Sequence, residues 1–600
     1  MDDLRHRIKL VEPAELPRRL LETGMVPKNS GKLPTVLLEL HSSVRDNTKQ
    51  LKNYGVLPWW TPDDLRASNW RPLDSFTHWL DYRLYPNSAL MIHIHNILWF
   101  AALISLVTIL YRRLMVPAWT GGLAAILYLL DESNYLPTAW IANRNLLLSV
   151  VFGILALLAH HRKCTNRSLA ANIFAPICLI LSLLSTEAGI AIVAYLFAYA
   201  IFLDKRKWTS RILSLAPYIL IVILWRVVYS ALGHGAYGSD FVIDPVREPF
   251  RFAVKVLERA PFLLMAQWSC LPAEIASFLP SSEKINAWLV SGGFLLLLII
   301  IFKPLLVKNR VAKFWFTAML LSVLPICATL PMNRNLLFVA IGAFALIAQF
   351  AKGLRTKEIW LPESRLWHAL AQVMCITLLF IHIILSGTGR IFQPRVIQAV
   401  QNQLKSTMQI GPLIGSENQD IVVVNAPSPF NSFYIPPFRA HYNESIPQAI
   451  RVLSPGFAPI EIIRINERAL QVRTKYVNLL SCGKRPGSPL IHFYEHLNGS
   501  FRNRSLPLNP GEKIVLPRLT VEIIDVDEKG MPTTVLFEFT VSLDHSTIRW
   551  LQFNWENGTY CPFRVPEIGQ TCEIAGPCPR TVPNQWMKYV SSLFCPEGDV

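Results

Sequence analysis

Several ionisable side chains flank long apolar segments of this 600-residue chain, where the burial of a charge is costly. One group precedes and opens the first apolar segment and consists of Arg71, Asp74, His78, Asp81, His93 and Asn96. His93 and His95 are two positions apart and cannot share one helix face, so we expect at most one of them to point into a site. Such residues often mark functional sites, so this group is a candidate site.

Three more charged residues fall at the ends of later apolar segments: Arg144 in TAWIANRN, Glu187 in LLSTEAGIAI and Arg334 in PMNRN. An arginine at a helix end more often contacts lipid headgroups than a substrate, whereas Glu187 has no obvious contact with solvent. Arginine makes paired contacts to phosphate oxygens, and a nearby carboxylate can accept a hydroxyl proton or hold a divalent cation. The pattern therefore indicates phosphate recognition, with Arg71, Arg144 and Arg334 as the candidate ligands.

Membrane-spanning helices are the elements that must position these residues. Hydrophobic residues make up 52% of the chain and charged residues 16%, whereas soluble proteins carry about 25% charged residues. Ten apolar segments are expected to form transmembrane helices, at 88–110, 116–131, 138–160, 171–184, 187–203, 213–232, 287–306, 314–331, 333–350 and 367–387. Residues 252–271 are amphipathic around a central proline and predict an interfacial helix instead. A soluble enzyme is thereby excluded.

The loop charges predict the orientation of the chain in the membrane. Basic residues recur in alternate short loops, beginning at Arg112, Arg162, Lys205, Lys308 and Lys352, and are almost absent from the short loops between them. Because cytoplasmic loops are enriched in Lys and Arg, we expect both termini and the loop 233–286 outside. The net charge of +17 is explained by these loops, so no nucleic-acid partner is expected.

Three regions follow from this topology. Residues 1–87 are an extracytoplasmic segment or first outer loop, residues 88–387 the transmembrane domain, and residues 388–600 an extracytoplasmic, mainly β domain. Strands are predicted at 421–424, 513–516, 519–526, 534–541 and 548–553, with helices at 395–410 and 444–453.

The cysteines of the C-terminal domain do not have the spacing of a zinc site. None of Cys482, Cys561, Cys572, Cys578 and Cys595 forms a CxxC pair. In an oxidising compartment a disulfide is expected instead. Cys572 with Cys578 is the first candidate, and Cys561 and Cys595 are the alternatives.

The order of several short motifs resembles that of bacterial GT-C-fold membrane glycosyltransferases, in particular the protein O-mannosyltransferases and the TPR-containing mannosyltransferases. The motifs are Asn69-Trp-Arg-Pro-Leu, Leu80-Asp-Tyr, His93-x-His-Asn, Trp140-Ile-Ala-Asn-Arg and Ser185-Thr-Glu187. The resemblance covers residues 57–205 and does not extend to the C-terminal domain.

The resemblance implies an enzyme of the bacterial inner membrane with its C-terminal domain in the periplasm. Such an enzyme transfers a sugar from a polyprenyl-phosphate donor to a glycan, lipid or protein acceptor on the outer face, often with Mg²⁺ or Mn²⁺. The alternative is a catalytically inactive scaffold or a transporter-like protein of the same fold. A transporter would more often show internal repeats, which this sequence lacks.

The resemblance also suggests roles for individual residues. Asp2 and Asp3 match the acidic catalytic pair, Asp63 and Asp64 are the alternative pair, and Glu187 is a third catalytic candidate. The supporting residues are His78, Asp81, His93 and Asn96, and the candidate metal ligands are Asp3 and His93. The family has a helix before its acidic pair, so we expect the natural start to lie upstream of Met1.

Overall fold

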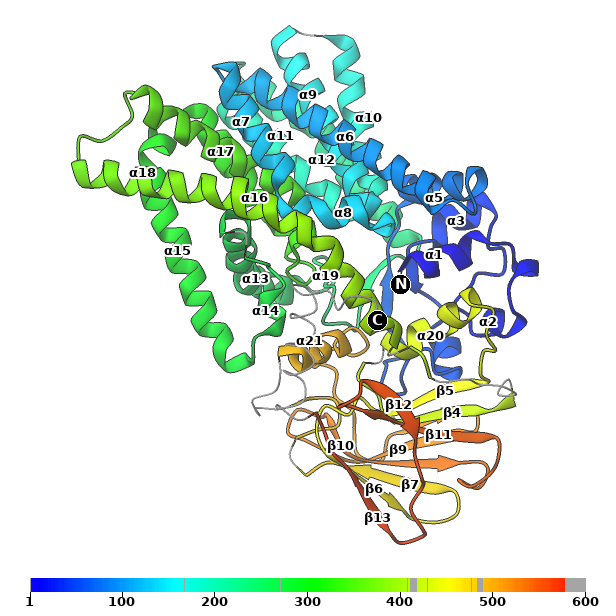
Figure 1. Cartoon of the computed structure of the whole chain (residues 1–600). Coiled ribbons are helices and arrows are strands. Elements are labelled where there is room, and N and C mark those ends of the chain that lie inside the picture. The colour runs from blue at the N-terminus through cyan, green and yellow to red at the C-terminus, as the bar shows by residue number, and fades with distance from the viewer. Residues whose placement is uncertain are drawn as a thin grey trace, which may run out of the picture.

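The structure, a computed structural model, describes residues 2–577 except 167, 270, 407, 411–417, 429, 476 and 483–488. A helical part and a β-rich C-terminal part are joined by helix α19 (Ser386–Ser406), and the N-terminal segment lies where the two parts meet (Figure 1).

All ten apolar segments predicted from the sequence lie in helices. These are α6 (Ala89–Leu114), α7 (Ala118–Leu130), α9 (Arg144–Asn166), α10 (Leu169–Ser185), η4 with α11 (Glu187–Ala191 and Ile192–Phe202), α12 (Trp208–Ala231), α15 (Ser281–Lys308), α16 (Arg310–Ile326), α17 (Leu337–Thr356) and α18 (Arg365–Leu379). Within the described residues, six helical segments are long and apolar enough to cross a membrane, and three shorter apolar helices accompany them. The chain is thus a helical protein suited to membrane integration.

Local sequence explains where several of these helices begin. The side chains of Ser88, Ser168, Asn309 and Ser364 each accept a hydrogen bond from a backbone N–H of the first turn of the helix that follows. Such caps satisfy N–H groups that have no partner inside the helix. Asn309 alone links α15 to α16, because its side chain caps the first turn of α16.

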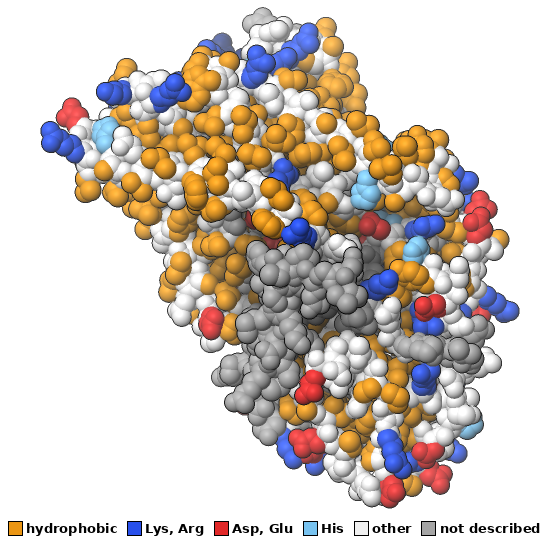
Figure 2. Space-filling view, in the orientation of Figure 1, with side chains coloured by type: hydrophobic (Ala, Val, Ile, Leu, Met, Phe, Trp, Pro, Cys, Tyr) orange, Lys and Arg blue, Asp and Glu red, His pale blue; other side chains and the backbone are white. Residues whose placement is uncertain are grey.

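Two helices form the centre of the helical part. The apolar windows of α9 and α17 are 83% and 89% buried, whereas those of α6 and α12 are each 17% buried. Gly342 lets α17 approach α16 closely, because a Cβ atom there would lie 2.7 Å from the backbone oxygen of Trp315. The outer helices expose apolar side chains over a broad surface, as a lipid-facing surface would (Figure 2).

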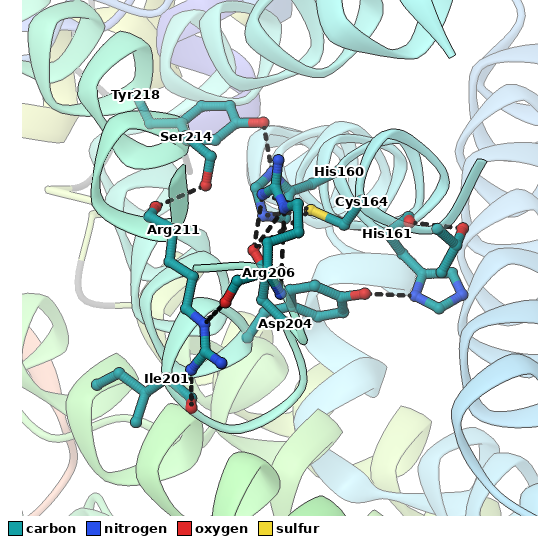
Figure 3. A network of polar contacts seen from close by, with 11 residues as sticks. His160, His161, Cys164, Ile201, Asp204, Arg206, Arg211, Ser214 and Tyr218 are labelled. Carbon is teal, nitrogen blue, oxygen red and sulfur yellow. Dashed lines mark hydrogen bonds and ion pairs between the residues drawn. The ribbon is translucent and has the colours of Figure 1, made fainter. Parts of the chain in front are cut away.

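The helix ends farthest from the C-terminal part are tied together by polar contacts (Figure 3). His160 and His161 of α9 bond to the hydroxyls of Tyr218 and Tyr199 at 2.9 and 2.8 Å. Asp204 and Arg206, in the link before α12, pair at 2.7 Å. We call this end of the helical part the distal end. The other end, where the helices meet the N-terminal segment, is the proximal end.

Residues 2–87 are folded and do not form an extended loop. They contain α1 (Asp2–Leu10), α2 (Arg18–Glu22), α3 (Leu33–Glu39), α4 (Thr48–Asn53) and α5 (Pro72–Leu84). Strands β1 (Ser42–Val44) and β2 (Arg66–Ser68) join β3 (Gly235–Tyr237) of the later loop in one antiparallel sheet. Trp59 and Trp60 are buried in the core of the C-terminal part, so this segment is integral to that part.

The predicted amphipathic segment forms α13 (Pro249–Ser269), followed by the short α14 (Ile275–Phe278). Helix α13 has Pro261 in its interior and packs against α15 and α16. It is not among the six candidate spans.

The C-terminal part contains two sheets. An antiparallel sheet has the order β13-β6-β7-β10-β9-β8, and a mixed sheet has the order β12-β11-β4-β5. The strands are β4 (Asp420–Asn425), β5 (Ala449–Ser454), β6 (Ile460–Arg464), β7 (Ala469–Arg473), β8 (Lys513–Leu516), β9 (Leu519–Val526), β10 (Pro532–Phe539), β11 (Ile548–Asn554), β12 (Thr559–Pro562) and β13 (Thr571–Ile574). The helices are α20 (Phe430–His441) and α21 (Pro489–Asn498).

All five strands predicted from the sequence are confirmed, but the helix predicted at 444–453 is wrong. Its second half forms β5, which pairs in parallel with β4 and is buried at every position. A strand buried on both faces lacks the alternation of a half-buried strand, and β5 also lacks the continuous β-branched run by which the equally buried β4 was predicted. The predicted disulfide of Cys572 with Cys578, and any pairing with Cys595, falls outside the described residues.

Candidate functional site

The two N-terminal aspartates lie at the proximal end of the helices. Asp3 accepts a hydrogen bond from the backbone N–H of Ala142 at 2.9 Å, just before α9 begins. Asp2 accepts one from the hydroxyl of Tyr434 on α20 at 2.6 Å. The start of the chain therefore contacts both the helical part and the C-terminal part.

The carboxyls of this pair have different electrostatic environments. Asp3 is exposed, and its pKa is raised, mainly because the surrounding protein desolvates it, with a contribution from the charge of Asp2. Burial also acts against ionisation of Asp2, but Arg5 and the Tyr434 hydrogen bond outweigh it and lower the pKa of that carboxyl. Two neighbouring carboxyls with opposite shifts are typical of acid–base sites.

Arg71 and Glu187 form an ion pair at the proximal end as well. Arg71 precedes Pro72 at the start of α5, and Glu187 opens η4, where α10 has ended. The Nε and Nη2 atoms of Arg71 donate to Oε2 of Glu187 at 2.9 and 2.8 Å, and Tyr229 donates to Oε1 at 3.2 Å. Nη1 of Arg71 has no hydrogen-bond partner among the described residues, so this edge of the guanidinium can receive an anion.

Arg334 adds a second cation to this end of the helices. Its Nη1 donates to Asn143 at 3.3 Å, and its guanidinium lies 5.1 Å from the ring centre of Trp140. It is close enough to Asp2 and Arg71 to interact electrostatically with both. The structure thus brings together Asp2, Asp3, Arg71, Glu187 and Arg334, which are far apart in the sequence.

Arg144 does not belong to this group. Its side chain is fully buried, pairs with Asp81 at 2.5 Å and also donates to Asn96, Thr77 and the Ile92 carbonyl. The other oxygen of Asp81 contacts His95 at 2.6 Å. The network joins α5, α6 and α9, so the structure assigns Arg144 to holding these helices and not to the predicted phosphate contact.

A cluster of buried histidines around Asp74 is the candidate metal centre. Asp74 and His78 lie one turn apart on α5, and His41 follows α3. Oδ2 of Asp74 lies 2.8 Å from Nε2 of His41 and 3.3 Å from Nε2 of His78. The ring of His6, on α1, is centred 4.7 Å from that of His41 and 5.4 Å from that of His78.

Asp74 is ion-paired with both His41 and His78, whereas His6 has no such partner among the described residues. Within the described residues, both ring nitrogens of His6 are buried without a hydrogen-bond partner. Each unpaired buried group costs about 1–3 kcal/mol. A cation between the groups would use the lone pairs of their nitrogen and oxygen atoms.

The donor atoms favour Zn²⁺ or iron over the predicted Mg²⁺ or Mn²⁺. Imidazole nitrogens suit Zn²⁺ and iron, whereas Mg²⁺ prefers an all-oxygen shell. A tetrahedral ion with Zn–N bonds of about 2.1 Å would hold imidazole centres roughly 5 Å apart. The ring centres of the three histidines are 4.7, 5.4 and 6.3 Å apart.

The predicted metal ligands lie elsewhere. Asp3 interacts with His78 only through its charge, and half-buried His93 has no hydrogen bond or ion pair among the described residues. The four-residue spacing of Asp74 and His78 could have indicated two ligands on one helix face. No local pattern pointed to His6 or His41, because both come from distant segments.

The alternative acidic pair lines a different cavity. Asp63 and Asp64 face a space of about 470 Å³ together with Arg45, Lys49, Arg66 and Arg247. Asp63 is also paired with Lys52 at 2.6 Å. The cavity contains none of the residues that gather around Asp3.

Comparison with protein-family models and with curated proteins finds no match to this chain. The assignment of a function therefore depends on the chemistry of the residues at the proximal end. These residues combine a carboxylate with a raised pKa, two arginines and a buried set of metal-binding groups.

Proposed function

We propose that this chain is an integral membrane glycosyltransferase with ten transmembrane helices and an extracytoplasmic C-terminal domain. It transfers a sugar from a polyprenyl-phosphate donor to a hydroxyl of a glycan, lipid or protein at the outer face of a bacterial inner membrane. One observation carries the proposal, namely that the start of α1 places an exposed Asp3 next to Asp2, which Arg334 reaches electrostatically together with Arg71, at one end of a bundle of apolar helices.

Each residue has a defined part in the proposed reaction. The acceptor oxygen bonds to the anomeric carbon as the bond from that carbon to the phosphate oxygen breaks, which inverts the configuration. The Asp3 carboxylate takes the hydroxyl proton, as a general base does. The polyprenyl phosphate leaves with its negative charge beside Arg334 and the open Nη1 edge of Arg71.

Glu187 is proposed to orient Arg71 and not to accept the proton. Its Oε2 atom receives two N–H groups of Arg71, and these bonds fix the plane of the guanidinium. The Nη1 edge of Arg71 therefore has a fixed direction before a phosphate binds. Less side-chain entropy of Arg71 is then lost on binding.

His41, Asp74 and His78, with His6, would hold the metal ion. When bound, such an ion supplies fixed positive charge, and Asp74 is within electrostatic range of Arg71. The ion would also attach α1, which carries Asp2 and Asp3, to α5.

The alternative is an inactive scaffold of the same fold. The observation in its favour is the Arg71–Glu187 pair, because each residue already neutralises the other. A transporter is less well supported, because the polar residues gather at one end of the helices instead of at mid-depth.

The test measures sugar transfer and donor hydrolysis by the full chain in nanodiscs, with a panel of polyprenyl-phosphate sugars and added Zn²⁺, Mn²⁺ or Mg²⁺. Asp3→Asn is expected to lower turnover about 100-fold or more, because it removes the base and preserves the shape. Arg71→Gln and Arg334→Gln should weaken donor binding, whereas Asp63→Asn is the matched control and should leave turnover unchanged. Unaltered turnover in Asp3→Asn would refute its role, and absence of donor binding by the parent would favour the scaffold.

A further inference from the structure

A second cluster of metal-binding side chains lies in the C-terminal part and contains Cys482, His492 and Glu495. All three residues are buried. The Sγ atom of Cys482 lies 2.7 Å from Oε2 of Glu495 and 3.5 Å from Nδ1 of His492. Nδ1 of His492 lies 3.9 Å from the same carboxylate oxygen. The three potential ligand atoms thus surround one point.

The local fold explains this convergence. His492 and Glu495 are three positions apart on α21 and therefore lie on one face of the helix. Cys482 is ten positions before His492, and its thiol contacts that face of the helix. It follows a turn in which the side chain of Asn478 accepts a hydrogen bond from the N–H of Leu480. The spacing Cys-x9-His-x2-Glu differs from the paired-cysteine pattern, so the cysteine spacing alone did not predict a zinc site.

The distances are close to those of a tetrahedral zinc site. Zn–S bonds of about 2.3 Å and Zn–N or Zn–O bonds of about 2.0–2.2 Å give ligand–ligand edges of roughly 3.4–3.6 Å. The S–N edge of 3.5 Å fits, and the N–O edge of 3.9 Å is slightly long. Only the S–O edge of 2.7 Å must lengthen, because it is the hydrogen bond that an ion would replace.

Neighbouring side chains orient the carboxylate. Oε1 of Glu495 accepts hydrogen bonds from Ser481 at 2.6 Å and from Arg504 at 2.8 Å, which turns Oε2 toward the thiol. Metal-binding carboxylates commonly have such outer contacts. A cysteine thiolate and the glutamate would together balance the charge of a divalent ion.

We propose that Cys482, His492 and Glu495 bind a zinc ion that has a structural role, with water or a further group at the fourth position. The ion would attach Cys482 to helix α21. Helix α21 in turn packs on α14, where the rings of Phe493 and Phe278 stack 4.8 Å apart. The site would therefore stabilise the contact between the C-terminal part and the loop that precedes α15, and it does not depend on the proposed sugar transfer.

The experiment measures Co²⁺ binding by the purified full chain after chelation of bound metal. A thiolate-to-Co²⁺ charge-transfer band is expected, and Zn²⁺ should abolish it. Cys482→Ser should remove the band, whereas Cys561→Ser is the matched control and should retain it. The His41–Asp74–His78 cluster has no thiol, so it cannot produce this signal. Absence of the band in the parent, or its persistence in Cys482→Ser, would overturn the proposal.

Two further measurements cover the case in which Cys482→Ser does not fold. Arg504→Gln keeps all three ligands and should weaken Zn²⁺ affinity about 10- to 100-fold. In the parent, alkylation of Cys482, followed by peptide mass spectrometry, should be slow with Zn²⁺ and fast after a chelator is added. Equal alkylation rates in the two conditions would show that the cluster is only hydrogen-bonded.

Discussion

The arginines at the proximal end show how burial divides one residue type between two roles. Arg144 is fully enclosed and uses its donors on Asp81, Asn96 and Thr77. Arg71 keeps 20% of its side chain exposed and leaves one nitrogen uncommitted. The first arrangement supports the structure, and the second can bind an anion.

Removal of the Arg144 charge should destabilise the helical part. Arg144→Gln leaves Asp81 buried without its cation, and breaking a buried pair in this way costs about 3–5 kcal/mol. We expect a clear fall in the Tm of the protein in detergent. Thermal unfolding is monitored by the fluorescence of a thiol-reactive dye. Arg18→Gln removes an exposed i,i+4 pair with Glu22 and should hardly change Tm. Equal Tm values for the two variants would contradict the structural role of Arg144.

The buried cluster around Asp74 makes a prediction about metal content. Through dialysis, Asp74→Asn should retain about one equivalent less of transition-metal ion than the parent, because the amide is a poor metal ligand and the separate Cys482 cluster is unchanged. Inductively coupled plasma mass spectrometry on parent and variant gives the metal-to-protein ratio. Asp46→Asn, at an exposed carboxylate, is the control and should keep the ratio of the parent. An unchanged ratio in Asp74→Asn would exclude this cluster as a binding site.

At the scale of elements, the N-terminal segment docks on the C-terminal part through backbone contact. The Tyr54 carbonyl accepts a hydrogen bond from the N–H of Ile450 at 3.2 Å, so the turn after α4 covers strand β5. Gly55 has a φ of +71°, and a Cβ atom there would lie 1.7 Å from the Ile450 oxygen. Only glycine permits so close an approach.

Gly55→Ala should therefore loosen this contact. Besides the penalty of about 1–2 kcal/mol for a left-handed residue, the methyl group would push the turn away from β5. Limited proteolysis should then cut the segment before α5 faster than in the parent. Gly511→Ala is the control, because Gly511 has a φ of +80° but open space around it. Similar proteolysis of the two variants would show that the close approach contributes nothing.

At the scale of the whole molecule, the side chains are distributed as a membrane protein requires. Apolar side chains cover the helical part, and Lys and Arg side chains lie along the edge of its distal end (Figure 2). The C-terminal part and the N-terminal segment adjoin the proximal end (Figure 1). If basic loops face the cytoplasm, the cluster around Asp3 faces outward.

Labelling with a membrane-impermeant maleimide tests this orientation. Ile359 is fully exposed in the link between α17 and α18, and Lys529 is exposed in the turn between β9 and β10. In intact spheroplasts, Lys529→Cys should gain label over the parent, whereas Ile359→Cys should gain it only after the cells are lysed. The reverse pattern would show that the basic loops face outward.

The local pattern of the sequence determined the elements of this protein. Apolar runs predicted the ten apolar helical segments, and β-branched runs predicted β4, β8, β9, β10 and β11. Burial of one side of a segment leaves a short-range periodicity, and burial of a whole segment leaves a continuous apolar run. Strand β5 could not be predicted in this way, because its sequence AIRVLS lacks the continuous β-branched run of the equally buried β4.

Only the tertiary structure decided which charged residues face a solvent-accessible site and which are enclosed. The sequence showed Arg71 and Arg144 alike at helix ends, and their different burial depends on packing among α5, α6 and α9. The histidines around Asp74 come from three separate segments, and Cys482 lies outside the helix that carries His492 and Glu495. Metal-binding groups in such clusters converge in space without a common spacing along the chain. Local periodicity in the sequence therefore cannot predict them.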